Sequence, residues 1–212
     1  HTGLDPAFYV PARGAERIGG GERTVWLVRG EDVRDYQITP SERCLFPYDS
    51  HGQASPPSPG SAEGIHYWRY RSPLASRIDF GRSIAERGMH FSEHSMFFAA
   101  RYVRPLGIGF SFVATHNHFA VDRGGKVFKQ TAPVIKLAAA ATEEDHLGLL
   151  GPLSSSTGCF WMKQAFFCRE KGGYGGGIKL EDWDEWYEFD TTKLSRLPVP
   201  PGQAAPVPRV RA

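Results

Sequence analysis

The chain has 212 residues, of which 41% are hydrophobic and 23% charged, and its formal net charge is +2. This composition is ordinary for a folded globular protein, and no apolar run approaches the roughly 20 residues that a membrane-spanning helix needs. A net charge this small does not indicate nucleic-acid binding by itself, because a track of phosphates is neutralised by several clustered cations.

The cysteines and the first residues bear on where the protein works. Cys44, Cys159 and Cys168 show no CxxC spacing, which argues against a disulfide framework and against a four-thiolate zinc site. We therefore expect a cytoplasmic location. The chain opens with HTGLDPAFYV, which has neither an initiator Met nor a secretory signal, so we expect a fragment of a longer protein.

The first half of the chain begins with short β-prone runs. Residues 24–29 (TVWLVR) and 42–48 (ERCLFPY) predict strands of a small sheet. Residues 49–64 are dense in Ser, Pro and Gly and predict a mobile loop. Aromatic and basic residues are interleaved over 67–96, where Pro and Gly interruptions leave room for two short helices.

The second half alternates between strand and helix patterns. Residues 106–114, 118–121 and 133–137 predict three adjacent strands. A helix should begin after Thr142 and stop or kink at Pro152, and a second helix should follow from the SSST segment to about Arg169. We expect that second helix to bury its aromatic residues Phe160, Trp161, Phe166 and Phe167.

Together these patterns predict a mixed α/β (α+β) fold, a small mixed sheet with flanking helices. The predicted domain covers residues 24–200, between an N-terminal extension of residues 1–23 and a disordered Pro-rich tail of residues 201–212. The Gly-rich segment 172–177 lacks the GK[ST] of a phosphate-binding loop and is interpreted as a connector.

The segment THNHFAVDRGGKVFK (residues 115–129) concentrates residues suited to DNA contact. Asn117 carries the paired donor and acceptor that match adenine, and Arg123, Lys126 and Lys129 surround a Gly-Gly turn from which they could reach guanine edges or phosphates. The alternative is that the polar side chains of residues 115–117 satisfy backbone groups at a strand end.

His116 and His118 would share one face of a strand, an arrangement compatible with metal binding. No third ligand is apparent, since Asp122, His146 or a cysteine could join only through folding, and no metal site is predicted.

Between Tyr67 and Arg71, aromatic residues alternate with Arg69 and Arg71 in a composition suited to binding a nucleic-acid backbone. Core packing of those aromatic residues is the alternative. Lys163 is expected to point outward, and it is predicted, like His116 and His118, to contact DNA.

Three stretches carry a family resemblance: residues 112–137, residues 147–173 and EWYEFDTTKLSRLPVP at 185–200. They resemble the C-terminal target recognition (specificity) region of the adenine-specific DNA methyltransferases of BREX phage-defence systems, the PglX-like enzymes. The early segment VRGEDVRDYQI resembles an element near the start of such regions, which makes Arg29, Arg34 and Tyr36 candidates for phosphate positioning. A solvated turn in which Asp32 or Asp35 pairs locally is the alternative.

The resemblance implies a DNA target recognition domain that binds double-stranded DNA and leaves methyl transfer to the other half of the same polypeptide. S-adenosylmethionine would be the cofactor of that parent enzyme, and no cofactor is expected here. No catalytic residue is predicted, because the chain lacks the [N/D/S]-P-P-[Y/F] loop that would hold an extruded adenine. A protein-interaction module that contacts other defence-complex subunits is the alternative.

Overall fold

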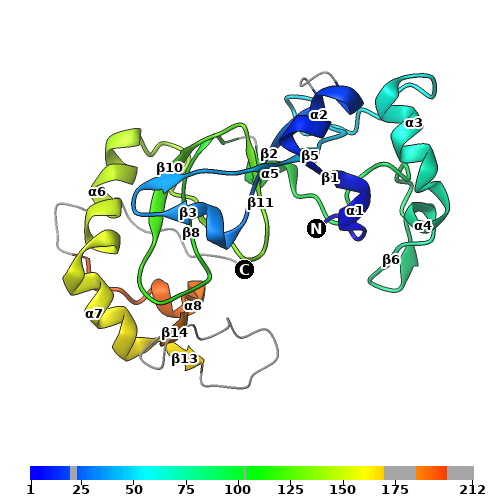
Figure 1. Ribbon diagram of the computed structural model, residues 1–212. Helices are drawn as coiled ribbons and strands as arrows, with labels where there is room; N and C mark the ends of the chain where they lie inside the picture. The colour runs from blue at the N-terminus through cyan, green and yellow to red at the C-terminus, as the bar shows by residue number, and fades with distance from the viewer. Residues whose placement is uncertain (20–22, 103, 170–184, 200–212) are drawn as a thin grey trace. The chain divides into compact units, whose positions relative to one another are not determined.

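A computed structural model describes residues 1–19, 23–102, 104–169 and 185–199 and confirms the mixed α/β class (Figure 1). The chain divides into two compact units. Unit 1 comprises His1–Leu27, Pro40–Arg104 and Gly125–Val127, and unit 2 comprises Val28–Thr39, Pro105–Gly124 and the chain from Phe128 onward. Each unit thus joins segments that are far apart in the sequence. Among the described residues, no helix is long and apolar enough to cross a membrane.

Unit 1 is built around a four-stranded sheet with strand order β1-β5-β2-β11. Strand β5 is paired antiparallel on both sides, with Cys44 opposite Tyr9 of β1 and opposite Val25 of β2. Its elements are α1 (Asp5–Phe8), β1 (Tyr9–Pro11), α2 (Ala12–Gly19), β2 (Thr24–Val28), β5 (Glu42–Leu45), α3 (Ala62–Arg69), α4 (Arg71–Ala75), β6 (Ile78–Asp79), β7 (Arg82–Ser83), α5 (Ala99–Tyr102) and most of β11 (Lys126–Phe128).

The strands and helices predicted for unit 1 are present, with shifted ends. Strand β5 ends at Leu45, before Pro47, a residue that cannot donate a ladder hydrogen bond. Helix α3 begins at Ala62, because the Ser61 Oγ accepts a hydrogen bond from the Gly64 N–H at 3.0 Å. Residues 62–64 of the predicted loop are therefore helical. The mobility of that loop stays a prediction.

The core of unit 1 includes Phe8, Leu27, Leu45, Tyr67 and Leu74. Tyr67 and Leu74 come from α3 and α4, which explains why these helices pack despite their shortness. Phe8 is fully buried, so the stretch ahead of β2 contributes to this core. The domain boundaries at residues 24 and 200 stay a prediction, and the Gly-rich segment 172–177 and the tail 201–212 lie outside the described residues.

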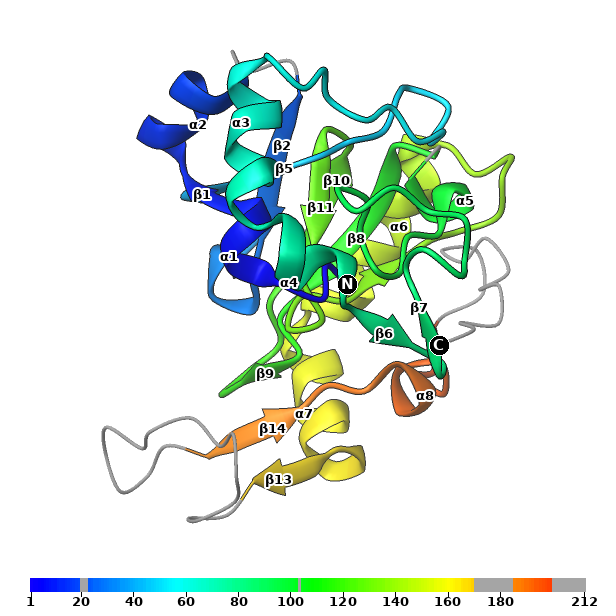
Figure 2. The same cartoon turned by 90° about the vertical axis from the view of Figure 1, so that its right-hand side faces the viewer.

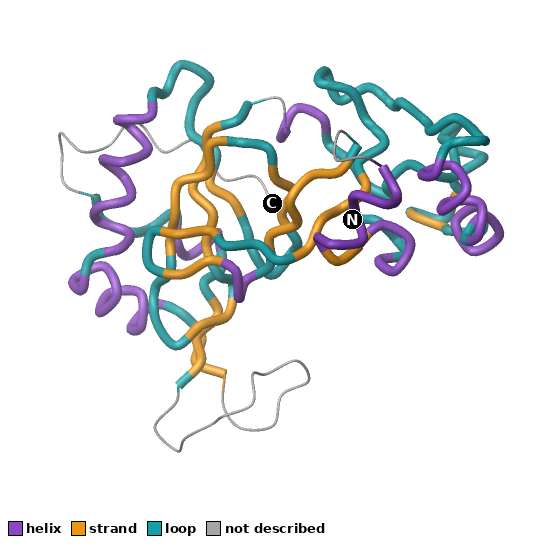
Figure 3. The backbone as a smooth tube through the Cα atoms, turned by 45° about the horizontal axis from the view of Figure 1, so that its top comes forward, coloured by secondary structure: helices purple, strands orange, loops and turns teal. Residues whose placement is uncertain are grey.

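Unit 2 is built on the antiparallel sheet β10-β8-β12, which confirms the three adjacent strands that the sequence predicts. A second sheet has the order β13-β14-β9 (Figure 2), and the strands are drawn in orange in Figure 3. The elements are a 3-10 turn (Gly30–Asp32), β3 (Val33–Arg34), β4 (Gln37–Ile38), β8 (Leu106–Phe110), β9 (Val113–Ala114), β10 (Phe119–Arg123), β12 (Val134–Ile135), α6 (Glu143–Ser154), α7 (Ser156–Ala165), β13 (Phe167–Arg169), β14 (Trp186–Glu188) and α8 (Thr191–Leu194).

Helix α6 begins where the sequence predicts. The Thr142 Oγ1 accepts from the Asp145 N–H at 3.3 Å, and Asp145 Oδ2 accepts from the Thr142 N–H at 2.7 Å, so a complete capping box starts the helix. Pro152 lies in the last turn, and the helix ends at Ser154. In Figure 1, α6 runs beside β10, and its buried residues Leu149 and Leu153 join the core of unit 2.

Helix α7 departs from the sequence prediction at its end. It stops at Ala165 instead of Arg169, because residues 167–169 form β13 and pair with β14. The expectation that all its aromatic residues are buried was wrong for Phe160 and Phe167, whose side chains are 68% and 61% exposed. Phe166 is buried, and Trp161 packs against the core. Strand pairing beyond Ala165 replaces the helical periodicity on which the expectation rested.

His94 is the buried ionisable group with the clearest consequence for stability. Its Nε2–H donates to the Leu45 carbonyl at 3.0 Å, and its backbone N–H donates to Tyr48 Oη at 2.9 Å. Burial, opposed only in part by the Leu45 hydrogen bond, and to a lesser extent the charges of the N-terminal amine and Arg77 together lower the pKa of His94 to about 4.

We predict that acid destabilises unit 1 through His94. In the unfolded state His94 is protonated below the ordinary histidine pKa of about 6.5, whereas in the folded state it is protonated only below about pH 4. The free energy of unfolding therefore falls as the pH falls between these two values. The loss attributable to His94 is about 2 kcal/mol between pH 7 and pH 5. Urea unfolding at several pH values should give a flatter profile for His94→Gln than for the wild type. The exposed His51 provides the control as His51→Gln; an unchanged profile in His94→Gln would contradict the prediction.

Candidate functional site

The turn between β3 and β4 lies at the centre of the candidate site. Asp35 and Tyr36 form it with φ values of 29° and 70°, so both residues have left-handed backbones. A two-residue turn with positive φ matches the right-handed twist of a hairpin, and Asp tolerates this conformation better than Tyr does. The Tyr36 N–H donates to the Phe119 carbonyl at 3.2 Å, which holds the turn beside the start of β10.

The turn that precedes β10 meets this hairpin. His118 is buried, and its Nδ1 lies 3.1 Å from Asp35 Oδ1. His116 is exposed, its ring centroid is 4.0 Å from that of His118, and its Nδ1 lies 3.0 Å from Thr115 Oγ1. Two segments that are far apart in the sequence thus present two imidazoles and a carboxylate side by side within unit 2.

The protonation of His118 follows from its surroundings. Burial lowers the pKa of His118 below its ordinary value, and the charges of His116 and Arg34 lower it further, whereas the hydrogen bond to Asp35 acts in the opposite direction. The neutral ring is therefore the favoured form at neutral pH. Because a carboxylate only accepts hydrogen bonds, the neutral ring carries its proton on Nδ1 and donates it to Asp35.

The side chain of Asn117 turns toward the protein's own backbone. Its Nδ2 donates to the Leu153 carbonyl at 2.6 Å and to the Ser155 carbonyl at 3.3 Å. Leu153 lies in the last turn of α6, and Ser155 is the cap between α6 and α7, whose carbonyl also accepts from the Cys159 N–H at 2.9 Å. The alternative that polar residues of this turn satisfy backbone groups thus describes Asn117. An adenine contact by Asn117 would require these two hydrogen bonds to break.

The cations around the Gly124–Gly125 turn have partners within the chain. The Arg123 side chain is 63% exposed, and its Nε and Nη2 donate to Glu143 Oε1 at 3.0 and 2.5 Å. Gly124 has a φ of 98°, and a Cβ there would lie 2.9 Å from the Pro105 Cβ. Only glycine fits that position without a shift. Lys129 belongs to unit 2, whereas Lys126 belongs to unit 1.

The arginines of the early segment support the 3-10 turn and the hairpin. The Arg29 N–H donates to Asp32 Oδ2 at 2.7 Å, and Arg29 Nη1 lies 3.8 Å from Glu31 Oε1. Arg34 Nη1 donates to the carbonyls of Gly30 and Val33 at 2.9 and 2.6 Å, which ties its guanidinium to the turn. Asp32 pairs locally as the alternative interpretation expects, but Asp35 pairs with His118.

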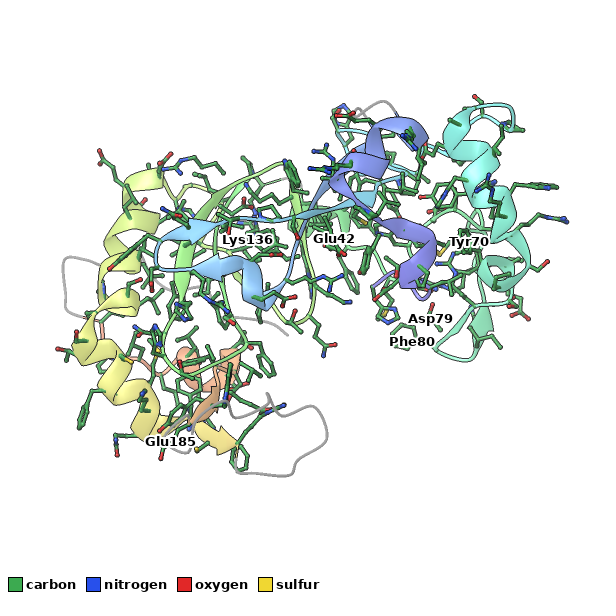
Figure 4. All side chains as sticks on the ribbon, viewed as in Figure 1. Glu42, Tyr70, Asp79, Phe80, Lys136 and Glu185 are labelled. Atoms are coloured by element: carbon green, nitrogen blue, oxygen red, sulfur yellow. The ribbon has the colours of Figure 1, made fainter. Side chains whose placement is uncertain are left out.

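Arg69 and Arg71 lie on exposed surface in unit 1. The Arg71 guanidinium is 4.6 Å from the ring centroid of Trp68, whose side chain is 62% exposed. Tyr67 is fully buried, so core packing and surface exposure, the two alternatives for this stretch, apply to different residues. Tyr67 packs in the core, and Trp68 forms a cation–π pair at the surface. Tyr70, labelled in Figure 4, follows the last residue of α3.

The structure therefore groups only part of the predicted site. Arg34, Tyr36, His116 and His118 come together in unit 2. Lys163, also in unit 2, lies on α7 with its Nζ 5.3 Å from the Tyr187 ring centroid. Asp35, the third member of the group that contains His116 and His118, was not predicted from the sequence. Its signal was the Asp-Tyr pair between the β-prone dipeptides VR and QI, a position that predicts a hairpin turn.

Comparison with known proteins relates the chain to an adenine-specific methyltransferase. No family model matches the sequence. The chain is 37% identical over 180 residues to the adenine-specific methyltransferase PglX of Streptomyces coelicolor, and the match covers 82% of this chain. It covers 15% of the methyltransferase, so the chain spans a small part of its relative's length. The chain is related to that segment of a PglX methyltransferase.

We predict that Tyr36 carries backbone strain. At a φ of 70° a glycine avoids the clash of a Cβ atom, whereas alanine removes the tyrosine ring but keeps the clash. Tyr36→Gly should therefore be more stable than Tyr36→Ala by about 1 kcal/mol in urea unfolding. A Tyr36→Ala protein that is as stable as Tyr36→Gly would contradict the left-handed conformation.

We predict that Asn117→Ala destabilises unit 2 by about 1 to 2 kcal/mol, because the Leu153 carbonyl in the last turn of α6 loses its Asn117 donor and the Ser155 carbonyl keeps only the Cys159 N–H. Chemical denaturation measures the loss. Gln164→Ala, which removes an exposed amide from α7, is the matched control and should change little. If Asn117→Ala leaves stability unchanged and abolishes selection of adenine-containing DNA, base reading is its role instead.

Proposed function

We propose that this chain is the DNA target recognition region of an adenine-specific DNA methyltransferase of the BREX phage-defence type. It would supply DNA binding and sequence specificity to an enzyme whose S-adenosylmethionine-binding and methyl-transferring half lies elsewhere in the same polypeptide. The observation that carries the proposal is the 37% identity to a segment that makes up 15% of PglX. At 212 residues the chain is long enough to fold as a domain with a core of its own.

The hairpin and turn of unit 2 support the DNA-binding part of this proposal. Tyr36 is 60% exposed, Arg34 and His116 are also exposed, and the backbone hydrogen bond from Tyr36 to Phe119 holds the hairpin in place. A rigid strand-turn element that carries cations and polar rings can enter a groove or bind phosphates without first paying a large ordering cost.

The ion pair of Arg123 is compatible with the same role. Arg123 and Glu143 are 63% and 43% exposed, and pairs of this kind contribute little to stability in water. A DNA phosphate could therefore replace Glu143 as the partner of the guanidinium at small cost. We propose that Arg29, Arg34, Tyr36, Lys126, Lys129 and Lys163 contact phosphates and that His116 lies beside them on the DNA-binding surface. Arg69 and Arg71 would bind a backbone from unit 1.

A protein-interaction module in a defence complex is the second candidate. It is favoured by the apolar end of the β6–β7 hairpin in unit 1, where Ile78 is 68% and Phe80 87% exposed (Figure 4). Exposed apolar residues of this size mark many protein interfaces. Such an interface would keep its affinity in salt, whereas DNA binding releases counterions and weakens steeply as the salt concentration rises.

The proposal predicts a sequence preference. Selection from a random-sequence duplex library at two salt concentrations should enrich one short motif that contains an adenine. Salt-sensitive binding without a motif would mean that sequence specificity also requires the methyltransferase half of the enzyme. The absence of binding at both salt concentrations would favour the interaction module.

The proposal also predicts that Arg34 contributes to the affinity for DNA. Arg34→Ala should weaken binding to all duplexes and reduce the slope of log K against log salt concentration by about 1, because one phosphate contact is lost. Fluorescence anisotropy over a salt series measures that slope. Arg196→Ala is the control, since Arg196 is an exposed arginine of unit 2 that lies outside the candidate site. Equal slopes for the two variants would remove Arg34 from the DNA-binding surface.

A further inference from the structure

Asp35, His116 and His118 have the composition of a metal site. Each offers one ligand atom, and the three atoms lie within 4.8 Å of one another. Two imidazoles and a carboxylate form a common ligand set for zinc and other first-row divalent cations, which leaves further coordination positions for water or substrate. We propose that these three residues bind a divalent transition-metal ion, with zinc as the expected occupant.

The three ligand atoms would need only a small displacement of their side chains to bind a zinc ion. Ligand atoms of a tetrahedral zinc site lie about 2.1 Å from the ion and therefore about 3.4 Å from each other. His118 Nδ1 and Asp35 Oδ1 are 3.1 Å apart, which is already close to that separation. His116 is the exposed member of the group, so its ring can rotate toward the other two without disturbing the core.

The hydrogen bonds around the group provide suitable ligand atoms. In the neutral His118 the proton on Nδ1 points to Asp35, and a metal ion would take the place of that proton while Nε2 becomes the protonated nitrogen. The Nδ1 of His116 lies 3.0 Å from Thr115 Oγ1. When Nδ1–H donates to that hydroxyl, Nε2 of His116 is the atom that can bind the ion, and the hydroxyl orients the ring.

The backbone holds the ligands in place before any ion binds. Asp35 lies in the β3–β4 turn, and the neighbouring Tyr36 is bonded to Phe119, the residue that follows His118. The His118 carbonyl accepts a hydrogen bond from the Ser111 N–H at 3.3 Å. Arg34 is the nearby positive charge, and two backbone carbonyls bind its guanidinium. An ion at this place would cross-link the hairpin to the turn before β10.

This proposal is independent of DNA binding and is tested without DNA. The untagged, metal-free 212-residue chain is titrated with Zn²⁺ by calorimetry and with Co²⁺ by visible absorption. We expect one equivalent to bind with a Co²⁺ spectrum of tetrahedral or five-coordinate type. His116→Ala should bind at least about 10-fold more weakly, and Asp35→Asn should also weaken binding.

The controls separate ligand loss from misfolding. His116→Ala replaces an exposed side chain, so its melting temperature without metal should equal that of the wild type, and Zn²⁺ should raise the melting temperature of the wild type only. His51→Ala, an exposed histidine of unit 1, should bind metal as the wild type does. Undiminished binding by His116→Ala, or no stoichiometric binding by the wild type, would overturn the proposal.

Discussion

The antiparallel pairing of β8 with β10 is the interaction on which unit 2 and the candidate site depend. It extends over five residue pairs, from Phe110 opposite Phe119 to Leu106 opposite Arg123. The rings of Phe110 and Phe119 stack at 5.2 Å between centroids, and both are buried. This pair closes the end of the ladder, and the polar segment 111–118 connects the two strands beyond it, so the pairing register fixes where that segment begins and ends.

That segment combines structural and exposed positions within a few residues. Asn117 donates to the carbonyls of Leu153 and Ser155 where α6 meets α7, His118 is buried against Asp35, and His116 is exposed. Because buried polar groups are costly without partners, the two inward residues are held in one conformation by their hydrogen bonds. The outward residue can respond to a ligand. This division gives the proposed DNA surface a rigid support, and it gives the proposed metal site two preplaced ligands and one adjustable ligand.

The relation to PglX and the local geometry support different parts of the functional proposal. The sequence identity connects the chain to a methyltransferase, whereas the proposed DNA contact in unit 2 rests on the exposed Arg34, Tyr36 and His116. Of the predicted DNA-binding residues, Arg69, Arg71 and Lys126 belong to unit 1. Each unit thus carries cations of its own, and each can be tested by substitutions that leave the other unchanged.

Local patterns in the sequence determined most of the elements. The alternation of residues 106–114 and 118–121 predicted β8 and β10, and Thr142 with Asp145 predicted the start of α6, because strand periodicity and capping act over neighbouring residues. Tertiary pairing decided the rest. Residues 167–169 became β13 because β14 lies beside them, and Asp35 reached His118 because the Tyr36 N–H bonds the Phe119 carbonyl. Contacts between residues so far apart in the chain depend on how the strands pair in space, and periodicity within a short window cannot encode them.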